Sequence, residues 1–192
     1  MALLFDEKLV AIENVLTESG IPHAFGGANA LAYYAPPRAT ADIDLNVFVP
    51  AAQTAQAARV LSVLASIGVS AGQAGQVEVI DRDGQVRVFW ERTPIDVFFS
   101  YDALHDSSME RRRSVDFGGE QIHILSGEDL IVYKAVFDRE KDWRDIAEML
   151  YACDEPFDFD YVRGWLRRIL PERDPRFDRL ERLIDSDGAN LG

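Results

Sequence analysis

The sequence predicts an α+β fold, in which a mixed β-sheet is flanked by helices and followed by a C-terminal helical appendage. Three observations support this prediction. Apolar residues recur at helical spacing near the N-terminus, strand-like segments and helices then share the chain up to Leu125, and only helical patterns follow from Ser126 onward. We therefore expect two parts, a mixed α/β domain over residues 1–125 and a helical subdomain over residues 126–192.

The first secondary-structure elements are predicted from residues that end helices and from a segment in which apolar and polar residues alternate. A helix is expected over residues 6–19, ended by Gly20 and Pro22, and a short extended piece at 23–25 leads into a small-residue helix at 28–35. The segment 41–49 then reads as a strand, with a long helix at 51–67 behind it. Side chains alternate along a strand, so one face should carry Ile43, Leu45, Val47 and Val49, and the other Asp42, Asp44, Asn46 and Phe48.

In the middle and at the end of the chain, turn and helix-capping residues indicate where strands and helices begin and end. Asp83-Gly84 between two β-rich segments, 76–80 and 85–91, predicts a hairpin, because Asp-Gly suits turns that need positive φ. A strand begins at Pro94, and a second hairpin is expected over 115–125. Ser126 with Asp129 resembles a helix cap, and two further amphipathic helices are expected at 158–169 and 173–185.

Composition and charge exclude several classes of protein. The chain has 20 Lys and Arg against 33 Asp and Glu, a net charge of −13, which opposes broad non-specific binding to nucleic acid. The single cysteine, Cys153, allows no intramolecular disulfide and favours a reducing compartment. We expect no secretory signal in the N-terminal residues, and no apolar run approaches the roughly 20 residues that span a bilayer. We expect a cytoplasmic protein with no membrane partner.

Three acidic residues on predicted strands indicate a metal site. Asp42 and Asp44 project from the same face of one apolar strand, where their repulsion and loss of hydration need compensation by a cation. Asp96 lies in a second strand of the same texture and completes a candidate two-metal site. Carboxylate oxygens favour Mg²⁺, which commonly keeps coordination positions for substrate phosphates.

A glycine pair precedes the short helix and indicates phosphate binding. Gly26 and Gly27 have no side chains, so the main chain can approach a ligand closely, and the N–H groups of the following turn point toward it. Phosphate-binding main chain together with paired carboxylates suits displacement at a phosphorus atom.

The segment FGGANALAYYAPPRATADIDLNVFV resembles the signature of the nucleotidyltransferase (DNA polymerase β-like) superfamily, with Asp96 as the third acid. The run from Arg38 to Asp44 and the segment Lys141-Asp142-Trp143-Arg144-Asp145-Ile146 are most similar to the AbiEii-type branch of toxin nucleotidyltransferases. The resemblance covers about residues 20–150 and implies a nucleotidyltransferase-like sheet, with the catalytic core over residues 1–125.

The resemblance also implies roles for individual residues. Asp42, Asp44 and Asp96 would be the catalytic metal ligands of a two-Mg²⁺ site, and the nucleoside triphosphate would be bound by Gly26, Gly27, Arg38, Thr40 and Lys134. The implied reaction moves a nucleoside monophosphate to an acceptor hydroxyl on RNA, protein or a small molecule. The branch implies a toxin–antitoxin setting with an antitoxin partner. Asp142 and Asp145 match acids of the family whose roles the sequence leaves open.

Several alternatives stay open. The acidic charge also suits a cationic antibiotic of the aminoglycoside kind as acceptor, and a non-catalytic nucleotide-binding module or a glycosyltransferase would use similar residues. Lys134 sits in an apolar helix and could instead lie at the edge of the core. His23, His105 and His123 have no metal-ligand spacing, so we expect surface or core histidines.

Overall fold

The structure is a computed structural model that describes residues 3–188. It divides into two compact units. Among the described residues, the first unit takes those up to Asn29 together with Ala39–Leu125, and the second takes Ala30–Arg38 and those from Ser126 onward. Residues 30–38, which the sequence analysis grouped with the α/β domain, thus belong to the helical unit.

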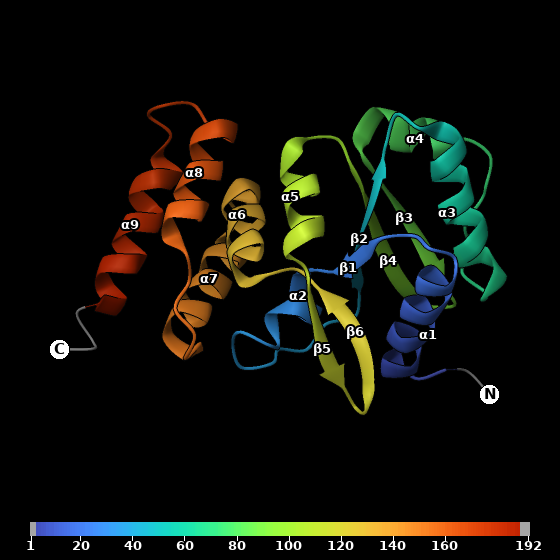
Figure 1. Cartoon of the computed structure of the whole chain (residues 1–192), viewed down its shortest axis with the longest axis horizontal. Helices are drawn as coiled ribbons and strands as arrows, with labels where there is room; N and C mark the ends of the chain where they lie inside the picture. Colours follow the sequence, from blue (N-terminus) through green and yellow to red (C-terminus); the bar gives the residue numbers. More distant parts are fainter. Residues whose placement is uncertain (1–2, 189–192) are drawn as a thin grey trace. The chain divides into compact units, whose positions relative to one another are not determined.

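The first unit is built on a mixed sheet, which has six strands among the described residues and the order β3-β4-β2-β1-β6-β5 (Figure 1). The pairs β2–β4 and β1–β6 are parallel, and the other neighbours are antiparallel. This architecture confirms the predicted fold class. The strands are β1 (His23–Phe25), β2 (Ile43–Pro50), β3 (Gln85–Trp90), β4 (Thr93–Ser100), β5 (Arg113–Phe117) and β6 (Glu120–Ile124).

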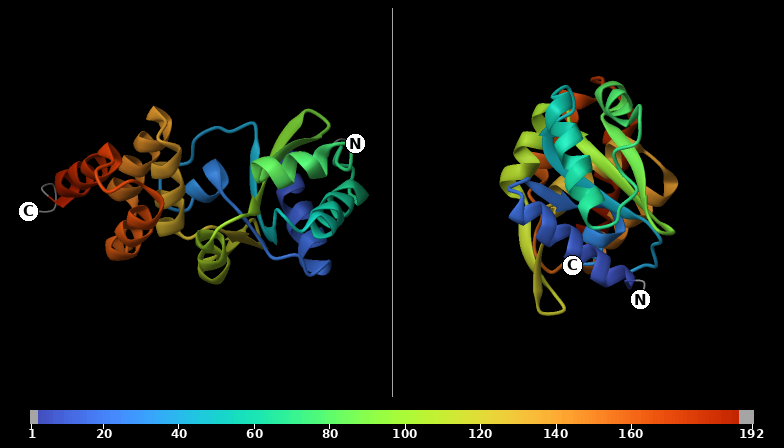
Figure 2. Two further views of the ribbon diagram at one scale, coloured as in Figure 1. Left: turned by 90° about the horizontal axis from the view of Figure 1, so that it is seen from above. Right: turned by 90° about the vertical axis from the view of Figure 1, so that its right-hand side faces the viewer.

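Helices α1 and α3 lie side by side in the first unit, and α3 also packs on β2 (Figures 1 and 2). Their apolar stripes meet the side chains predicted to share one face of β2, and Ile43, Leu45 and Val47 are fully buried there. The alternation of strand side chains therefore leaves Asp44 on the other face. The helices of this unit are α1 (Phe5–Glu18), α2 (Gly27–Leu31, whose last two residues join the second unit), α3 (Thr54–Ser66), α4 (Gln76–Asp83) and α5 (Ala103–Arg111).

The second unit is helical, with α6 packed against both α7 and α8, and α9 packed against α7 (Figure 1). The hydroxyl of Ser126 accepts a hydrogen bond from the Asp129 N–H and so caps α6, as the sequence predicted. No helix within residues 3–188 has the length and apolar character needed to cross a membrane. The elements are α6 (Gly127–Phe137), α7 (Glu140–Ala152), α8 (Phe159–Ile169) and α9 (Pro175–Gly188).

One predicted element is wrong. Residues 76–83 form helix α4 and not the first strand of a hairpin. Gly84 has φ of +68° and its N–H donates to the Ile80 carbonyl, so the Asp-Gly pair ends a helix, for which positive φ is equally suitable. Burial of Ile80 fixes this helix on the first unit, and β3 instead forms its hairpin with β4.

Candidate active site

The pairing of β2 with β4 brings two of the predicted acids side by side. The strands are parallel, and Asp44 lies directly opposite Asp96 in the register. Adjacent strands are about 4.8 Å apart, and paired residues point to the same face of the sheet. Asp42 stands immediately before β2, two residues from Asp44, and all three acids are half-buried. Three carboxylates therefore occupy one patch of the first unit.

Strand β3 adds a positive charge to this patch. Arg87 lies opposite Asp96 in the β3–β4 ladder and donates two hydrogen bonds to its carboxylate, Nε to Oδ1 and Nη2 to Oδ2, each 2.6 Å long. The pKa of Arg87 is raised, mainly by the hydrogen bond and charge of Asp96, with a smaller contribution from the charges of Asp42 and Asp44. The Arg87 guanidinium thus interacts electrostatically with all three acids, and it neutralises the charge of Asp96.

The glycine pair lies directly against Asp44. The Gly26 N–H donates to the Asp44 carbonyl at 2.9 Å. Gly27 has φ of +51°, and a Cβ at this position would overlap the Asp44 carboxylate. A Cβ on Gly26 would lie 2.7 Å from the Asn46 side-chain nitrogen. Both positions therefore require glycine. The main chain at these residues lies in direct contact with Asp44 of the acidic patch.

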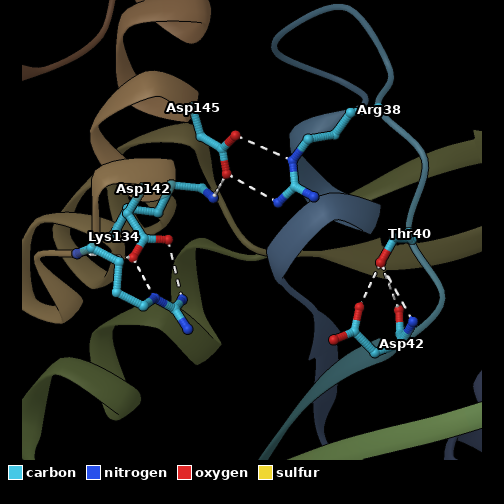
Figure 3. Close-up of polar contacts among 7 residues, drawn as sticks. Arg38, Thr40, Asp42, Lys134, Asp142 and Asp145 are labelled. Carbon is cyan, nitrogen blue, oxygen red and sulfur yellow. Dashed lines mark hydrogen bonds and ion pairs between the residues drawn. The ribbon is translucent and has the colours of Figure 1, made fainter.

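Thr40 holds the first acid. Its hydroxyl donates to Asp42 Oδ1 at 2.6 Å and accepts from the Asp42 N–H at 3.4 Å, a closed local arrangement visible in Figure 3. A carboxylate oxygen fixed in this way keeps its orientation relative to the strand. Thr40 thus positions Asp42, and the structure gives it no further contact that would assign it to a nucleotide.

Two of the predicted nucleotide-binding residues lie in the second unit, where they share one carboxylate (Figure 3). Lys134 Nζ donates to Asp145 Oδ2 at 2.5 Å, and Arg38 donates to both Asp145 oxygens at 3.1 Å. Lys134 and Asp145 are buried, whereas the Arg38 side chain is 41% exposed. Burial raises the pKa of Asp145, but the hydrogen bonds from Lys134 and Arg38 outweigh it and the pKa is lowered.

The neighbouring acid, Asp142, is part of a helix start. It is buried, and its carboxylate accepts from the N–H and the guanidinium of Arg139, which precedes α7. A carboxylate in the first turn also interacts favourably with the helix dipole. Asp142 therefore stabilises the N-terminus of α7 in the described structure.

The structure thus gathers Asp42, Asp44, Asp96 and the glycine pair in the first unit, and ties Arg38 and Lys134 to Asp145 in the second. Sequence reasoning missed Arg87. Its strand was identified, and its alternation with Val86 and Val88 could have placed it on the polar face, but the register that sets it opposite Asp96 has no local signal.

The residues of the acidic patch fit a divalent cation. The available donors are carboxylate oxygens, which hard cations such as Mg²⁺ prefer. The Arg87 guanidinium already supplies positive charge at Asp96, which indicates that this patch needs a cationic partner. Because Gly27 has no Cβ, the Asp44 carboxylate can occupy the position that a side chain at residue 27 would take.

Comparison with solved structures supports the same fold. The lincosamide antibiotic adenylyltransferase LnuA, in its lincomycin-bound crystal structure, matches with a TM-score of 0.52 and 16% identity over 76% of this chain and 96% of its own. The antibiotic-resistance factor ANT(2'')-Ia matches with a TM-score of 0.50 and 14% identity over 97% of this chain and 92% of its own. No family model matches the sequence, and a search of curated proteins finds no match. The chain therefore has a nucleotidyltransferase-like fold.

Proposed function

We propose that the protein is a magnesium-dependent nucleotidyltransferase that moves a nucleoside monophosphate from a nucleoside triphosphate to an acceptor hydroxyl. The observation that carries this proposal is the in-register pair Asp44 and Asp96, with Asp42 just before the same strand and Gly27 against the Asp44 carboxylate. The likeness of the fold to an adenylyltransferase supports it.

Each part of the acidic patch has a place in this reaction. Asp42, Asp44 and Asp96 would hold Mg²⁺, which when bound supplies positive charge to the attacking and leaving oxygens. The main chain at Gly26 and Gly27, which lies against the Asp44 side chain, would receive the triphosphate. Thr40 keeps the Asp42 carboxylate oriented.

The bonds and protons of the transfer balance with these residues. The acceptor oxygen forms a bond to the α-phosphorus, the bond from that phosphorus to the β-phosphate oxygen breaks, and pyrophosphate leaves. Asp96 is the carboxylate proposed to take the proton of the acceptor hydroxyl. For this, Arg87 must release at least one oxygen of Asp96, since its guanidinium now occupies both. Arg38 and Lys134, which both donate to the Asp145 carboxylate, are proposed to bind phosphate oxygens.

Two acceptor classes follow from different observations. The sequence resemblance to the AbiEii-type branch favours an RNA or protein hydroxyl in a toxin–antitoxin pair, with a separate antitoxin chain and a cytoplasmic location. The net charge of −13 and the fold of LnuA favour a small cationic antibiotic. Both classes use the same transfer chemistry and differ in the acceptor and in the need for an antitoxin partner.

The test is pyrophosphate release. The protein with Mg²⁺ is incubated with each α-labelled nucleoside triphosphate and with total RNA, a purified protein mixture or a set of aminoglycosides and lincosamides. We expect label transfer that is lost in Asp44→Asn and kept in Asp83→Asn, a control from the exposed Asp81-x-Asp83 sequence. Binding of a triphosphate without pyrophosphate release under every condition would instead indicate a nucleotide-binding module.

A further inference from the structure

Two histidines and a glutamate meet in the first unit, away from the acidic patch. Glu13 comes from α1, His23 from β1 and His123 from β6. Glu13 and His23 are each 3% exposed, and the His123 side chain is 31% exposed. One potential ligand atom from each residue lies within 4.8 Å of the other two. Spacings of 10 and 100 residues along the chain explain why no sequence motif announced this cluster.

The Glu13 carboxylate is the centre of the cluster. Its Oε2 lies 2.9 Å from His23 Nε2, and its Oε1 lies 2.7 Å from His123 Nδ1. The main-chain N–H of His123 and the hydroxyl of Thr17 donate to the same carboxylate. Burial raises the pKa of Glu13, but the interactions with His23 and His123 outweigh it and lower the pKa to about 2. The group is therefore a buried carboxylate that only accepts hydrogen bonds at neutral pH.

The two ring nitrogens of His23 face different partners. Nδ1 lies 2.9 Å from the Ile21 carbonyl oxygen and donates to it, because that oxygen can only accept. Nε2 is directed at the Glu13 carboxylate, 2.9 Å from Oε2. A metal ion bound to Nε2 and to Glu13 would use the lone pairs of both atoms.

We propose that Glu13, His23 and His123 form a binding site for a divalent transition metal, specifically Zn²⁺, with water as the fourth ligand. Two imidazole nitrogens and one carboxylate oxygen are a ligand set that Zn²⁺ takes, whereas Mg²⁺ prefers oxygen alone. Ligand atoms around tetrahedral Zn²⁺ are roughly 3.4 Å apart at the usual bond lengths. His23 and His123 contact different oxygens of Glu13, at 2.9 and 2.7 Å, so the three ligand atoms must move apart by roughly half an ångström or more to surround the ion.

The surroundings already fix the ligands as a metal site would need. Metal-bound histidines commonly donate their other ring N–H to a carbonyl, and His23 Nδ1 does so to Ile21. Ligating carboxylates are themselves held by hydrogen bonds, and Thr17 holds Glu13. The partial exposure of His123 gives a path for the ion and for its water ligand.

The site is separate from the acidic patch. His23 pairs with Val47, whose buried side chain lies on the opposite face of β2 from Asp44. A bound ion would tie α1 to β1, which follows it directly along the chain, and to β6, which lies far from both in the sequence, and would stabilise the first unit by linkage. This proposal does not depend on the proposed transferase activity.

The test is titration of the metal-free full chain with Zn²⁺ against a chromophoric chelator, in an Asp44→Asn background that weakens carboxylate binding at the acidic patch. We expect one Zn²⁺ per chain. His123→Ala should lower the affinity by at least about 100-fold, and the outer-shell change Thr17→Val by about tenfold. His105→Asn, which alters the third histidine and keeps a donor toward Asp102, should bind like the parent.

Two results would overturn the proposal. One is the absence of stoichiometric Zn²⁺ binding at neutral pH, which would mean that protons alone hold the cluster together. The other is equal affinity in the His123→Ala and His105→Asn variants. Co²⁺ serves as a second probe, because its visible absorption reports nitrogen ligation at four-coordinate sites. An unchanged Co²⁺ spectrum in His123→Ala would contradict the site even where zinc still binds. Thr17→Val changes no ligand, so it provides a test even if a ligand variant fails to fold.

Discussion

Replacing Gly27 by alanine tests the contact between the glycine pair and the acidic patch. Two effects add at this position. The positive φ of +51° costs a residue with a Cβ about 1–2 kcal/mol. The new methyl group would also overlap the Asp44 carboxylate. That carboxylate must therefore move from its present place beside Asp96.

Gly20 provides a matched control for the backbone effect. Its φ is +62°, and a Cβ there would have nothing within 4 Å. Gly20→Ala should therefore lower the free energy of unfolding by about 1–2 kcal/mol, measured by urea unfolding, and should leave the acidic patch unchanged. The difference between the two variants isolates the displacement of Asp44.

The assay is Mn²⁺ binding, followed by electron paramagnetic resonance in the presence of a nucleoside triphosphate. Because disturbance of a ligand's support commonly weakens metal binding by about 10–100-fold, Gly27→Ala should lose at least tenfold in Mn²⁺ affinity. Gly20→Ala should bind like the wild type. Equal affinities in the two variants would refute the argument that Gly27 is required by its approach to Asp44.

Three further predictions concern the side-chain contacts of Asp96, Asp42 and Asp145. Arg87→Gln should lower the Mg²⁺ concentration needed for half-maximal pyrophosphate release by about two- to fivefold, because the partly exposed ion pair with Asp96 competes with the metal for about 0.5–1 kcal/mol; an increase would contradict this competition. Thr40→Val should weaken Mn²⁺ binding about tenfold by freeing the Asp42 carboxylate, with unchanged affinity as the contrary result. Asp145 has a lowered pKa, so its contribution to stability is present above its unfolded pKa near 3.8 and is lost as pH falls through the folded value. The stability of the wild type should therefore fall more steeply below pH 4 than that of Asp145→Asn in urea unfolding, and parallel pH profiles would count against the interaction.

The strand that carries the first two acids was predictable from local pattern. Apolar and polar residues alternate from Ala41 to Val47, so burial of one face and placement of Asp44 on the other follow from the pleat alone. The position of Asp96 beside Asp44 depends on the parallel pairing of β2 with β4. No sequence signal sets that register, so the sequence could only suggest the third acid by its apolar surroundings.

Helix α4 shows where local pattern misleads. Val77, Val79 and Ile80 are β-branched and precede Asp-Gly, which together favour a hairpin. Burial of Ile80 on the first unit and the role of Gly84 as a helix end decide otherwise, and both are tertiary or cap effects.

The hydrogen-bond partners of the basic and histidine side chains could not be predicted from the sequence, for a similar reason. Lys134 and Arg38 meet on Asp145 although 96 residues separate them, and Glu13 meets His123 from 110 residues away. Such contacts arise from packing of whole elements, and an isolated charged residue in the sequence gives no indication of which distant group it will contact.

The most direct test of the central claim is a crystal structure with Mn²⁺ and a nucleoside triphosphate that cannot be cleaved between its α- and β-phosphates, read by the anomalous signal of manganese. We expect manganese between the carboxylates of Asp42, Asp44 and Asp96, with Arg87 withdrawn from Asp96 and the triphosphate against Gly26 and Gly27. Manganese and triphosphate bound elsewhere on the chain, with the Arg87–Asp96 pair intact, would contradict it.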